Sequence, residues 1–348
     1  MRVRLGTWRH IDLHRRRGMV LRWPDSRTRR NSLKTIAFGI LICAVFRTTA
    51  GEAREPAALL RVQAHDGWIA AVAFSPSGDR IATAGDDETL KVWQSHDGRL
   101  VRAIDGLKSA VTAVAYSSDG RRIVAGTWDG SLRSWDAERG DQLLTVRAHD
   151  ENILCLAQSP DDRRIATGGG DDRLRVWDAQ NGRLLLDLHS ENEYDVTCVA
   201  FSPDGKYFLS GDGENHVTIW DAQTGRQLMQ LSGHSETISA CSFTPDGKRL
   251  VTGSWDDTVR IWDAATGREL RMLRGHTSDV SCLRLTSDGR RIVSGGDDRT
   301  VCLWDSSSGN LLHTWKDHPK RTTCLAVSPE GNRLAIGSLG TLTIWNLP

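Results

Sequence analysis

Residues 275–309 read GHTSDVSCLRLTSDGRRIVSGGDDRTVCLWDSSSG, and this stretch contains most of one structural unit. It holds three short apolar runs, Val280–Leu285, Arg291–Gly295 and Thr300–Trp304, and a fourth, Leu311–Trp315, follows directly. Turn-forming sequences such as TSDG and SSSG separate the runs. Runs of this length that are rich in Val, Ile, Leu and Thr and bounded by such turns predict β-strands. The stretch therefore predicts a small antiparallel sheet of four strands.

The same unit recurs along the chain, and its clearest mark is a tryptophan. Seven tryptophans are spaced by 41 to 43 residues: Trp93, Trp135, Trp177, Trp220, Trp262, Trp304 and Trp345. A repeat of this length is typical of propellers and solenoids. No window sustains the 3.6-residue period of paired helices, which excludes a helical solenoid. We therefore expect an all-β protein, a seven-bladed β-propeller of four-stranded antiparallel blades that covers residues 57–348.

The two ends of this region predict how the ring closes. Leu59–Val62 aligns with the fourth strand of another unit, Leu270–Leu273, but lacks the three strands before it. The last unit stops at Pro348, three residues after Trp345, and lacks a fourth strand of its own. We expect the N-terminal strand to complete the last blade and so to join the two ends of the ring.

Residues 1–56 differ in composition from the rest and are predicted to be an export leader outside the folded domain. They hold 13 Lys and Arg against 4 Asp and Glu. The apolar run Ile36–Phe46 follows Arg29 and Arg30, and small residues such as Ala50 and Ala53 come after it. The run has 11 residues, whereas a helix needs roughly 20 to span a bilayer. This order of basic, apolar and small residues is typical of a cleaved signal peptide.

The segment Thr28–Lys34, TRRNSLK, is similar to the twin-arginine export motif, with Ser32 where that motif prefers Phe. The similarity favours an exported protein, in the periplasm or outside the cell. Two alternatives remain open. Residues 36–46 could be an uncleaved membrane anchor, or the leader could be a mitochondrial presequence, which is also rich in Arg and poor in acidic residues. A lipoprotein signal at Cys43 is excluded, because Ile42 is bulky where that processing needs a small residue.

The rest of the chain holds 32 Lys and Arg against 40 Asp and Glu, so the predicted propeller is acidic. An acidic body lacks the electrostatic footprint of a nucleic-acid-binding protein. The chain contains no Cys-x-x-Cys, no His-Glu-x-x-His, no glycine-rich phosphate loop and no nucleophile elbow. We therefore expect no nucleic-acid partner, no metal, no cofactor and no catalytic site.

Four of the seven cysteines occupy one position on the innermost strand of their units: Cys155, Cys198, Cys282 and Cys324. Other units have Ala there, so the position favours a small buried side chain. Equivalent positions in adjacent blades should lie about 10 Å apart, whereas a disulfide needs Cα atoms within about 7 Å. We expect core thiols, neither disulfides nor metal ligands.

The Gly-His, Ser-Pro-Asp-Gly and Trp-Asp elements at these spacings resemble those of WD-repeat propellers, and the resemblance covers residues 57–348. In that family a His, a Ser or Thr, an Asp and the Trp of one blade form a buried hydrogen-bonded tetrad. The resemblance assigns four complete tetrads: His65, Thr83, Asp87 and Trp93; His149, Thr167, Asp171 and Trp177; His234, Thr252, Asp256 and Trp262; His276, Ser294, Asp298 and Trp304. The chemistry fits, because an indole N–H only donates while a hydroxyl both donates and accepts.

The other three repeats depart from this pattern. The second has Leu107 and Ala125, the fourth has Asn192 and Glu214, and the seventh has His318 without the Asp. A Ser or Thr with a His and an Asp could instead be a nucleophilic triad. Four copies at equivalent positions, each with a Trp, favour the structural interpretation.

The resemblance also implies a binding surface, since propellers of this family commonly bind peptides at the mouth of the central channel. The positions concerned lie three residues after the tetrad His and directly before the tetrad Asp. The candidate partner-binding residues are Trp68, Trp128, Trp255, Asp86, Asp279, Asp297 and Arg321. Exposed Trp is enriched in binding hot spots, and the carboxylates favour a basic partner. In the alternative interpretation the three rings only stack on neighbouring blades.

The expected function is a non-catalytic scaffold that binds a protein or a peptide, with membrane contact only through an uncleaved leader. The alternative is an enzyme, or an accessory domain for a small ligand, that uses the channel mouth. The fold alone does not identify the partner.

Overall fold

The computed structural model describes residues 58–189, 194–316 and 320–348. In these ranges all regular elements are β-strands, and none of the described segments forms a helix able to span a membrane. The leader, and with it every expectation for residues 1–56, lies outside the described residues, as do Asn192 and His318.

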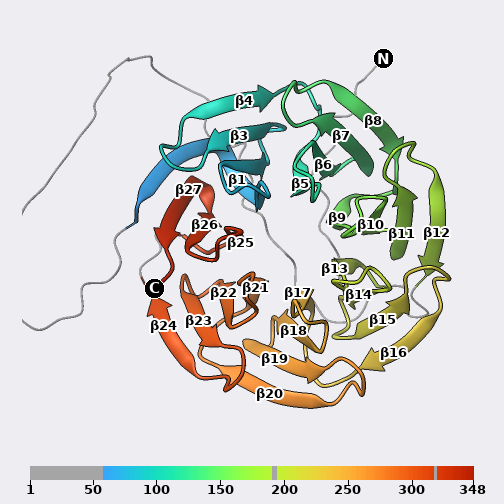
Figure 1. The fold of residues 1–348 in the computed structure, drawn as a ribbon, viewed down its shortest axis with the longest axis vertical. Coiled ribbons are helices and arrows are strands. Elements are labelled where there is room, and N and C mark those ends of the chain that lie inside the picture. The colour runs from blue at the N-terminus through green and yellow to red at the C-terminus, as the bar shows by residue number, and fades with distance from the viewer. Residues whose placement is uncertain (1–57, 190–193, 317–319) are drawn as a thin grey trace, which may run out of the picture. The chain divides into compact units, whose positions relative to one another are not determined.

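Each repeat contributes strands in chain order from the centre of the ring to its edge (Figure 1). The innermost strands are β1 (Leu60–Phe74), β5 (Val111–Tyr116), β9 (Ile153–Gln158), β13 (Val196–Phe201), β17 (Ile238–Phe243), β21 (Val280–Leu285) and β25 (Cys324–Val327). The second strands are β2 (Arg80–Gly85), β6 (Arg122–Thr127), β10 (Arg164–Gly169), β14 (Tyr207–Asp212), β18 (Arg249–Ser254), β22 (Arg291–Gly296) and β26 (Arg333–Gly337). The third strands are β3 (Leu90–Gln94), β7 (Ser131–Asp136), β11 (Arg173–Asp178), β15 (Val217–Asp221), β19 (Thr258–Asp263), β23 (Val301–Asp305) and β27 (Leu339–Asn346). The outermost strands are β4 (Leu100–Ile104), β8 (Gln142–Arg147), β12 (Leu184–His189), β16 (Gln227–Leu231), β20 (Glu269–Arg274) and β24 (Leu311–Trp315).

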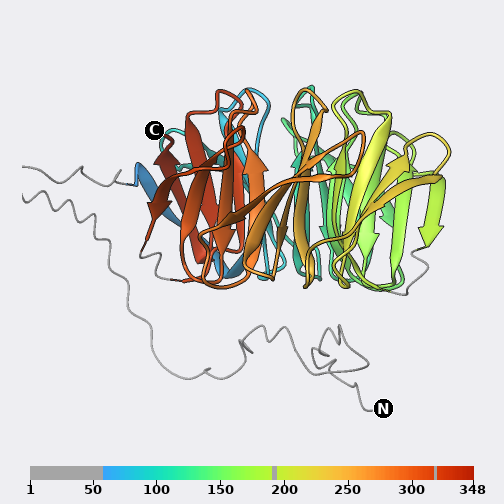
Figure 2. The ribbon, with the colours of Figure 1, turned by 90° about the horizontal axis from the view of Figure 1, so that it is seen from below.

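The blades form a closed ring. Neighbouring strands within each blade are antiparallel, as in the fifth blade, where β17, β18, β19 and β20 follow in order. The innermost strands of successive blades contact one another around the whole ring, including β25 with β1 (Figure 1). Seen from the side, the strands run from one face of the ring to the other (Figure 2). This arrangement confirms the predicted seven-bladed propeller.

Ring closure occurs where the sequence predicts it, but through a longer strand than expected. The first part of β1, Leu60–Gln63, pairs with β27, and its second part, Ile69–Phe74, pairs with β2. The register shifts between these two parts. One strand therefore belongs to two blades, the last and the first, and it joins them into a single hydrogen-bonded sheet.

The hydrophobic core lies between neighbouring blades, because each sheet has an apolar face on both sides. At one such interface Val251 and Val259 of the fifth blade pack with Ile292 and Trp304 of the sixth. The repeat tryptophans therefore bury their rings between sheets, and Trp262 and Trp304 are among the largest fully buried side chains. A blade depends on both of its neighbours for its core.

The cysteines of the described residues are free thiols, and the shared position on the innermost strand faces a glycine of the second strand. Gly168 is opposite Cys155, and a Cβ at Gly168 would lie 2.7 Å from the Cys155 sulfur. A glycine lies opposite this position in six blades, and Ala84 lies opposite Ala71 in the first, so the two strands approach closely where both residues are small. Burial raises the pKa of the Cys282 and Cys324 thiols to about 12, so both are protonated at neutral pH.

Candidate functional site

Four blades contain a hydrogen-bonded tetrad that connects the blade's first three strands. In the fifth blade, Trp262 Nε1 donates to the Thr252 hydroxyl over 2.9 Å, and His234 Nε2 lies 2.7 Å from the same oxygen. His234 Nδ1 in turn lies 2.8 Å from Asp256 Oδ2. The first, third and sixth blades contain the same three bonds at 2.6–3.0 Å.

The buried position of the tetrad hydroxyls decides between a structural network and a catalytic triad. The residues that carry them are 0 % exposed: Thr83, Thr167, Thr252 and Ser294. Each oxygen is already bonded to an indole N–H and to an imidazole nitrogen. A substrate cannot reach these hydroxyls, so the four sets are structural networks that hold the loops of a blade in one arrangement.

In the sixth blade the tetrad His and Asp side chains stabilise each other's charged forms. Burial opposes both charges there, but the hydrogen bond between His276 and Asp298 outweighs the effect of burial. The pKa of His276 is therefore raised to about 9, and the pKa of Asp298 is lowered to about 2. In the other three tetrads burial would likewise raise the pKa of the carboxyl, yet bonds from the His hold the pKa of Asp87, Asp171 and Asp256 well below its usual range.

The second and fourth blades contain only fragments of this network. In the second blade Ala125 takes the place of the hydroxyl residue, and Asp129 instead accepts a 2.5 Å hydrogen bond from Thr127. In the fourth blade Ser210 accepts the Trp220 indole N–H over 2.8 Å. Among the described residues, the fourth blade keeps one of the three tetrad bonds and the second blade keeps none.

The candidate binding positions lie side by side at one end of each blade, at the mouth of the channel. In six blades the N–H of the residue before the tetrad-Asp position donates to the carbonyl of the residue three after the His position. The bonds are 2.9–3.2 Å long and join Asp86 to Trp68, Trp128 to Ala110, Gly170 to Asn152, Gly213 to Asp195, Trp255 to Thr237, and Asp297 to Asp279.

Trp68 does not present an exposed ring, which corrects the expectation for this residue. It is 8 % exposed, and the guanidinium of Arg321 covers its ring with Cζ 4.8 Å from the ring centroid. Arg321 also donates to Asp297 over 3.2 Å, so it connects the sixth, seventh and first blades. A cation over an indole face is attracted to it. The stacking interpretation therefore holds for Trp68, whereas Asp297 and Arg321 remain partly exposed beside it.

The other two tryptophans are half-buried and stand at either end of a sector of four blades. Trp128 belongs to the second blade and Trp255 to the fifth. The third and fourth blades, between them, have Gly170 and Gly213 at the same position. The two positions between the aromatic rings thus carry no side chain.

An acidic group, Glu151, Asp172 and Asp195, lies in this same sector. Burial, followed by the nearby carboxylates of Asp172 and Glu151, raises the pKa of Asp195 to about 7. Burial and the neighbouring aspartates likewise raise the pKa of Glu151. At the candidate position Asp86, burial raises the pKa to about 6, and at Asp279 burial and Asp297 raise it as well. The mouth therefore brings several carboxyl groups close together, and burial and their mutual repulsion oppose the ionisation of Asp195 and Glu151.

Comparison with known proteins agrees with this geometry. The family model described as "WD domain, G-beta repeat" matches seven segments: residues 57–94, 98–136, 140–178, 182–221, 225–263, 267–305 and 309–346. The chain belongs to the WD-repeat family. It is also 43 % identical over 42 residues to nuclear distribution protein PAC1 of Tuber melanosporum, a match that covers 12 % of this chain and 9 % of that protein. It is 44 % identical over 43 residues to protein HIR1 of Mycosarcoma maydis, with 12 % and 4 % covered. The matches thus span under a tenth of either relative, about one WD repeat.

Two parts of the mouth of this WD-repeat ring were not predicted from the sequence. The first is the pair Glu151 and Asp172, although a doublet of aspartates after two glycines at 169–172 was a visible signal. The second is that small hydroxyl residues five after the His position connect the blades. Thr112 donates to the Ile153 carbonyl of the next blade over 2.6 Å, and Thr323 donates to Ile69 over 2.6 Å.

The described part of this WD-repeat domain offers no group of three or more His, Cys, Asp or Glu side chains that could hold a metal ion. The mouth carries aromatic rings and carboxylates. These are groups that bind a partner through stacking and charge.

Proposed function

We propose that this WD-repeat propeller is a non-catalytic scaffold whose channel mouth binds a basic segment of a protein partner. The observation that carries the proposal is the acidic group between Trp128 and Trp255. Large rigid rings supply contact area at low entropic cost, and they are the side chains on which hot spots are most often built. Carboxylates between them would select a partner segment that carries Lys or Arg.

The raised pKa of Asp195 supports a cationic partner. A carboxyl whose ionisation is opposed by burial and by neighbouring acids gains most from a positive charge brought beside it.

The rim tryptophans should separate binding from folding. We expect Trp128→Ala and Trp255→Ala each to weaken binding of a basic peptide by about 1–4 kcal/mol, as truncation of a hot spot does. Their free energy of unfolding should change less than that of Trp68→Ala, since both rings are less buried than the Trp68 ring. Selection of Lys- and Arg-containing peptides from an array, followed by titration calorimetry and denaturant melts, measures both quantities.

Trp68→Ala is the matched control for these variants. Because Trp68 is buried beneath Arg321, its truncation should lower the stability of the ring by about 3 kcal/mol. Asp195→Asn should weaken binding while the fold is retained. Unchanged peptide binding in the Trp128 and Trp255 variants would place the docking surface elsewhere on the ring.

We further propose that the protein is exported and that its leader is removed, on the strength of Arg29 and Arg30 before the apolar run. N-terminal sequencing of the protein from its natural host should then begin near Gly51 or Arg54. Replacement of both arginines by Lys should leave the unprocessed chain inside the cell. A mature protein that begins at Met1 in the cytosol would contradict export.

A further inference from the structure

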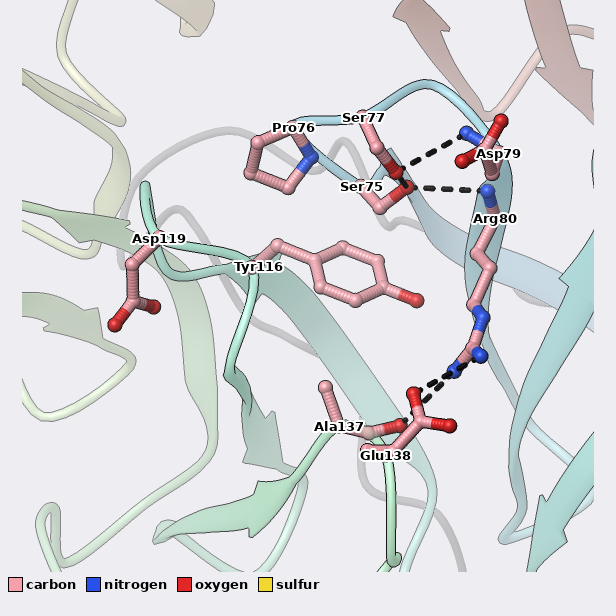
Figure 3. Close-up of a pocket in the computed structure, with 10 residues that line it drawn as sticks. Ser75, Pro76, Ser77, Asp79, Arg80, Tyr116, Asp119, Ala137 and Glu138 are labelled. Carbon is pink, nitrogen blue, oxygen red and sulfur yellow. Dashed lines mark hydrogen bonds and ion pairs between the residues drawn. The ribbon is translucent and has the colours of Figure 1, made fainter.

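On the face opposite the mouth, arginines clamp neighbouring blades together. The clamp residue is the first residue of a blade's second strand: Arg80, Arg122, Arg164, Arg249, Arg291 and Arg333. Its guanidinium reaches the next blade, where it usually donates to the backbone carbonyl just after the third strand. Arg122 donates to Ala179 over 2.7 Å, and Arg164 to Ala222 over 2.5 Å. Figure 3 shows the same kind of contact between the first and second blades, where Arg80 contacts the Ala137 carbonyl and Glu138.

Several clamp arginines also lie over an aromatic ring of the next blade. Arg164 Cζ is 5.7 Å from the centroid of Phe201, and Arg333 Cζ is 5.6 Å from that of Phe74. Both rings belong to the last residue of an innermost strand. A carbonyl acceptor and an aromatic face thus form a ready site for a guanidinium, which suits Arg because its flat group can stack and donate together.

The junction between the fourth and fifth blades has this site but lacks its arginine. The clamp position there is Tyr207, which pairs with Asp221 in the same register as Arg164 with Asp178. Tyr207 is 39 % exposed. The fifth blade nevertheless supplies both halves of the acceptor site, Phe243 at the end of β17 and Ala264 after β19.

A groove opens where the clamp is missing. It has a volume of about 800 Å³ and is lined by Tyr207, Phe243 and Ala264. The hollow at the first junction, where Arg80 lies, measures about 260 Å³. Leu228 and Met229 add apolar walls to the larger groove. The absence of one guanidinium thus coincides with the wider opening.

The charges around the groove match a cationic occupant. Its lining includes the carboxylates Asp204, Asp246 and Asp263 but only one cation, Lys248. Asp204 also has an ion pair with Lys206 at 3.3 Å. The hydrogen bonds that Asp246 and Asp263 accept within their own turns, from the Thr244 and Thr266 hydroxyls among others, all end on Oδ1. Carboxylates beside an aromatic face favour a guanidinium.

We propose that the groove between the fourth and fifth blades binds an arginine side chain of a partner polypeptide, which takes the place of the missing clamp. The guest guanidinium lies over Phe243 and donates to the Ala264 carbonyl, as Arg164 does with Phe201 and Ala222. Apolar residues next to that arginine contact Leu228 and Met229. This second docking site lies on the opposite face from the mouth and does not depend on the function proposed for the mouth.

Tyr207→Arg tests the proposal, because it restores the clamp and fills the groove from within. The probe is a fluorescein-labelled peptide selected from a displayed heptapeptide library with a fixed central Arg. We expect the wild-type protein to bind it, and Tyr207→Arg to weaken binding at least tenfold while raising the melting temperature by about 2 °C. Replacing the central Arg of the peptide by citrulline should also weaken binding at least tenfold.

Two controls keep the result specific. Tyr207→Leu leaves the groove open without a clamp, so binding should fall by no more than a few fold. Trp128→Ala and Trp255→Ala should leave it unchanged, which separates this site from the mouth. Failure to select an Arg peptide, equal binding by Tyr207→Arg, or loss of binding in the two Trp variants would each overturn the proposal.

Discussion

A protein that begins at Ala64 should lose the stability of the whole ring, whereas one that begins at Pro56 should match the full chain. The shorter variant lacks Leu60–Gln63, which pairs with Thr341–Ile344 of the last blade. Leu60 and Val62 also pack against the core formed by Ile344 and Leu342. Removing two apolar side chains of this size costs about 3 kcal/mol or more. It also uncovers the edge of β27, which invites aggregation.

Thermal melts and size-exclusion chromatography of both variants measure this effect. Leu60→Ala with Val62→Ala in the full chain should reproduce much of the loss, because these side chains face the core. Arg61→Ala, on the exposed side of the same strand, should have almost no effect. A stable monomer that starts at Ala64 would contradict the role of this strand in closure.

Asp256→Ala should destabilise the protein by about 1–3 kcal/mol, because it leaves several buried donors without an acceptor. The Asp256 carboxylate receives bonds from His234, from the Thr258 hydroxyl over 2.5 Å and from the Ser235 backbone N–H over 3.2 Å. Its side chain is only 5 % exposed. Urea melts of the variant measure the loss.

Asp129→Ala is the matched control, since its blade lacks the tetrad His and the side chain of Asp129 is 40 % exposed. It should cost clearly less than Asp256→Ala, and equal losses would refute the structural role of the tetrads.

The difference in stability between wild type and Asp256→Ala should also depend on pH. The pKa of Asp256 in the folded protein lies below its usual value of 3.8, so its contribution is present above that value and is lost as the pH falls through the folded pKa. The stability difference between wild type and Asp256→Ala should therefore begin to shrink as the pH falls below 3.8 and should disappear only below the folded pKa of Asp256.

The repeat pattern alone determined the number of blades and the strand order, and the resemblance to WD-repeat propellers assigned the tetrads. These features are local and periodic. Turns and alternating strands can be recognised within a single unit. The 42-residue distances from Trp93 to Trp135 and from Trp135 to Trp177 show that the unit repeats. The tetrad partners lie at fixed separations inside one repeat, so the resemblance could be carried over to four of the seven copies. The closing strand could also be predicted, because one unit had a surplus strand and another lacked one.

Burial at the mouth depended on contacts that no single repeat contains. Trp68 occupies a position that the pattern marks as exposed, but ring closure brings Arg321, 253 positions later in the sequence, over its indole face. The acidic group likewise joins Glu151 and Asp172 of one blade with Asp195 of the next, and its shifted pKa values arise from that proximity. In the sequence Tyr207 looks like an ordinary strand residue. Only the structure shows that the neighbouring blade carries an acceptor site for an arginine at this position. Periodicity therefore determined the blades, whereas the properties of the surfaces between them came from side chains of different blades that only the closed ring brings together.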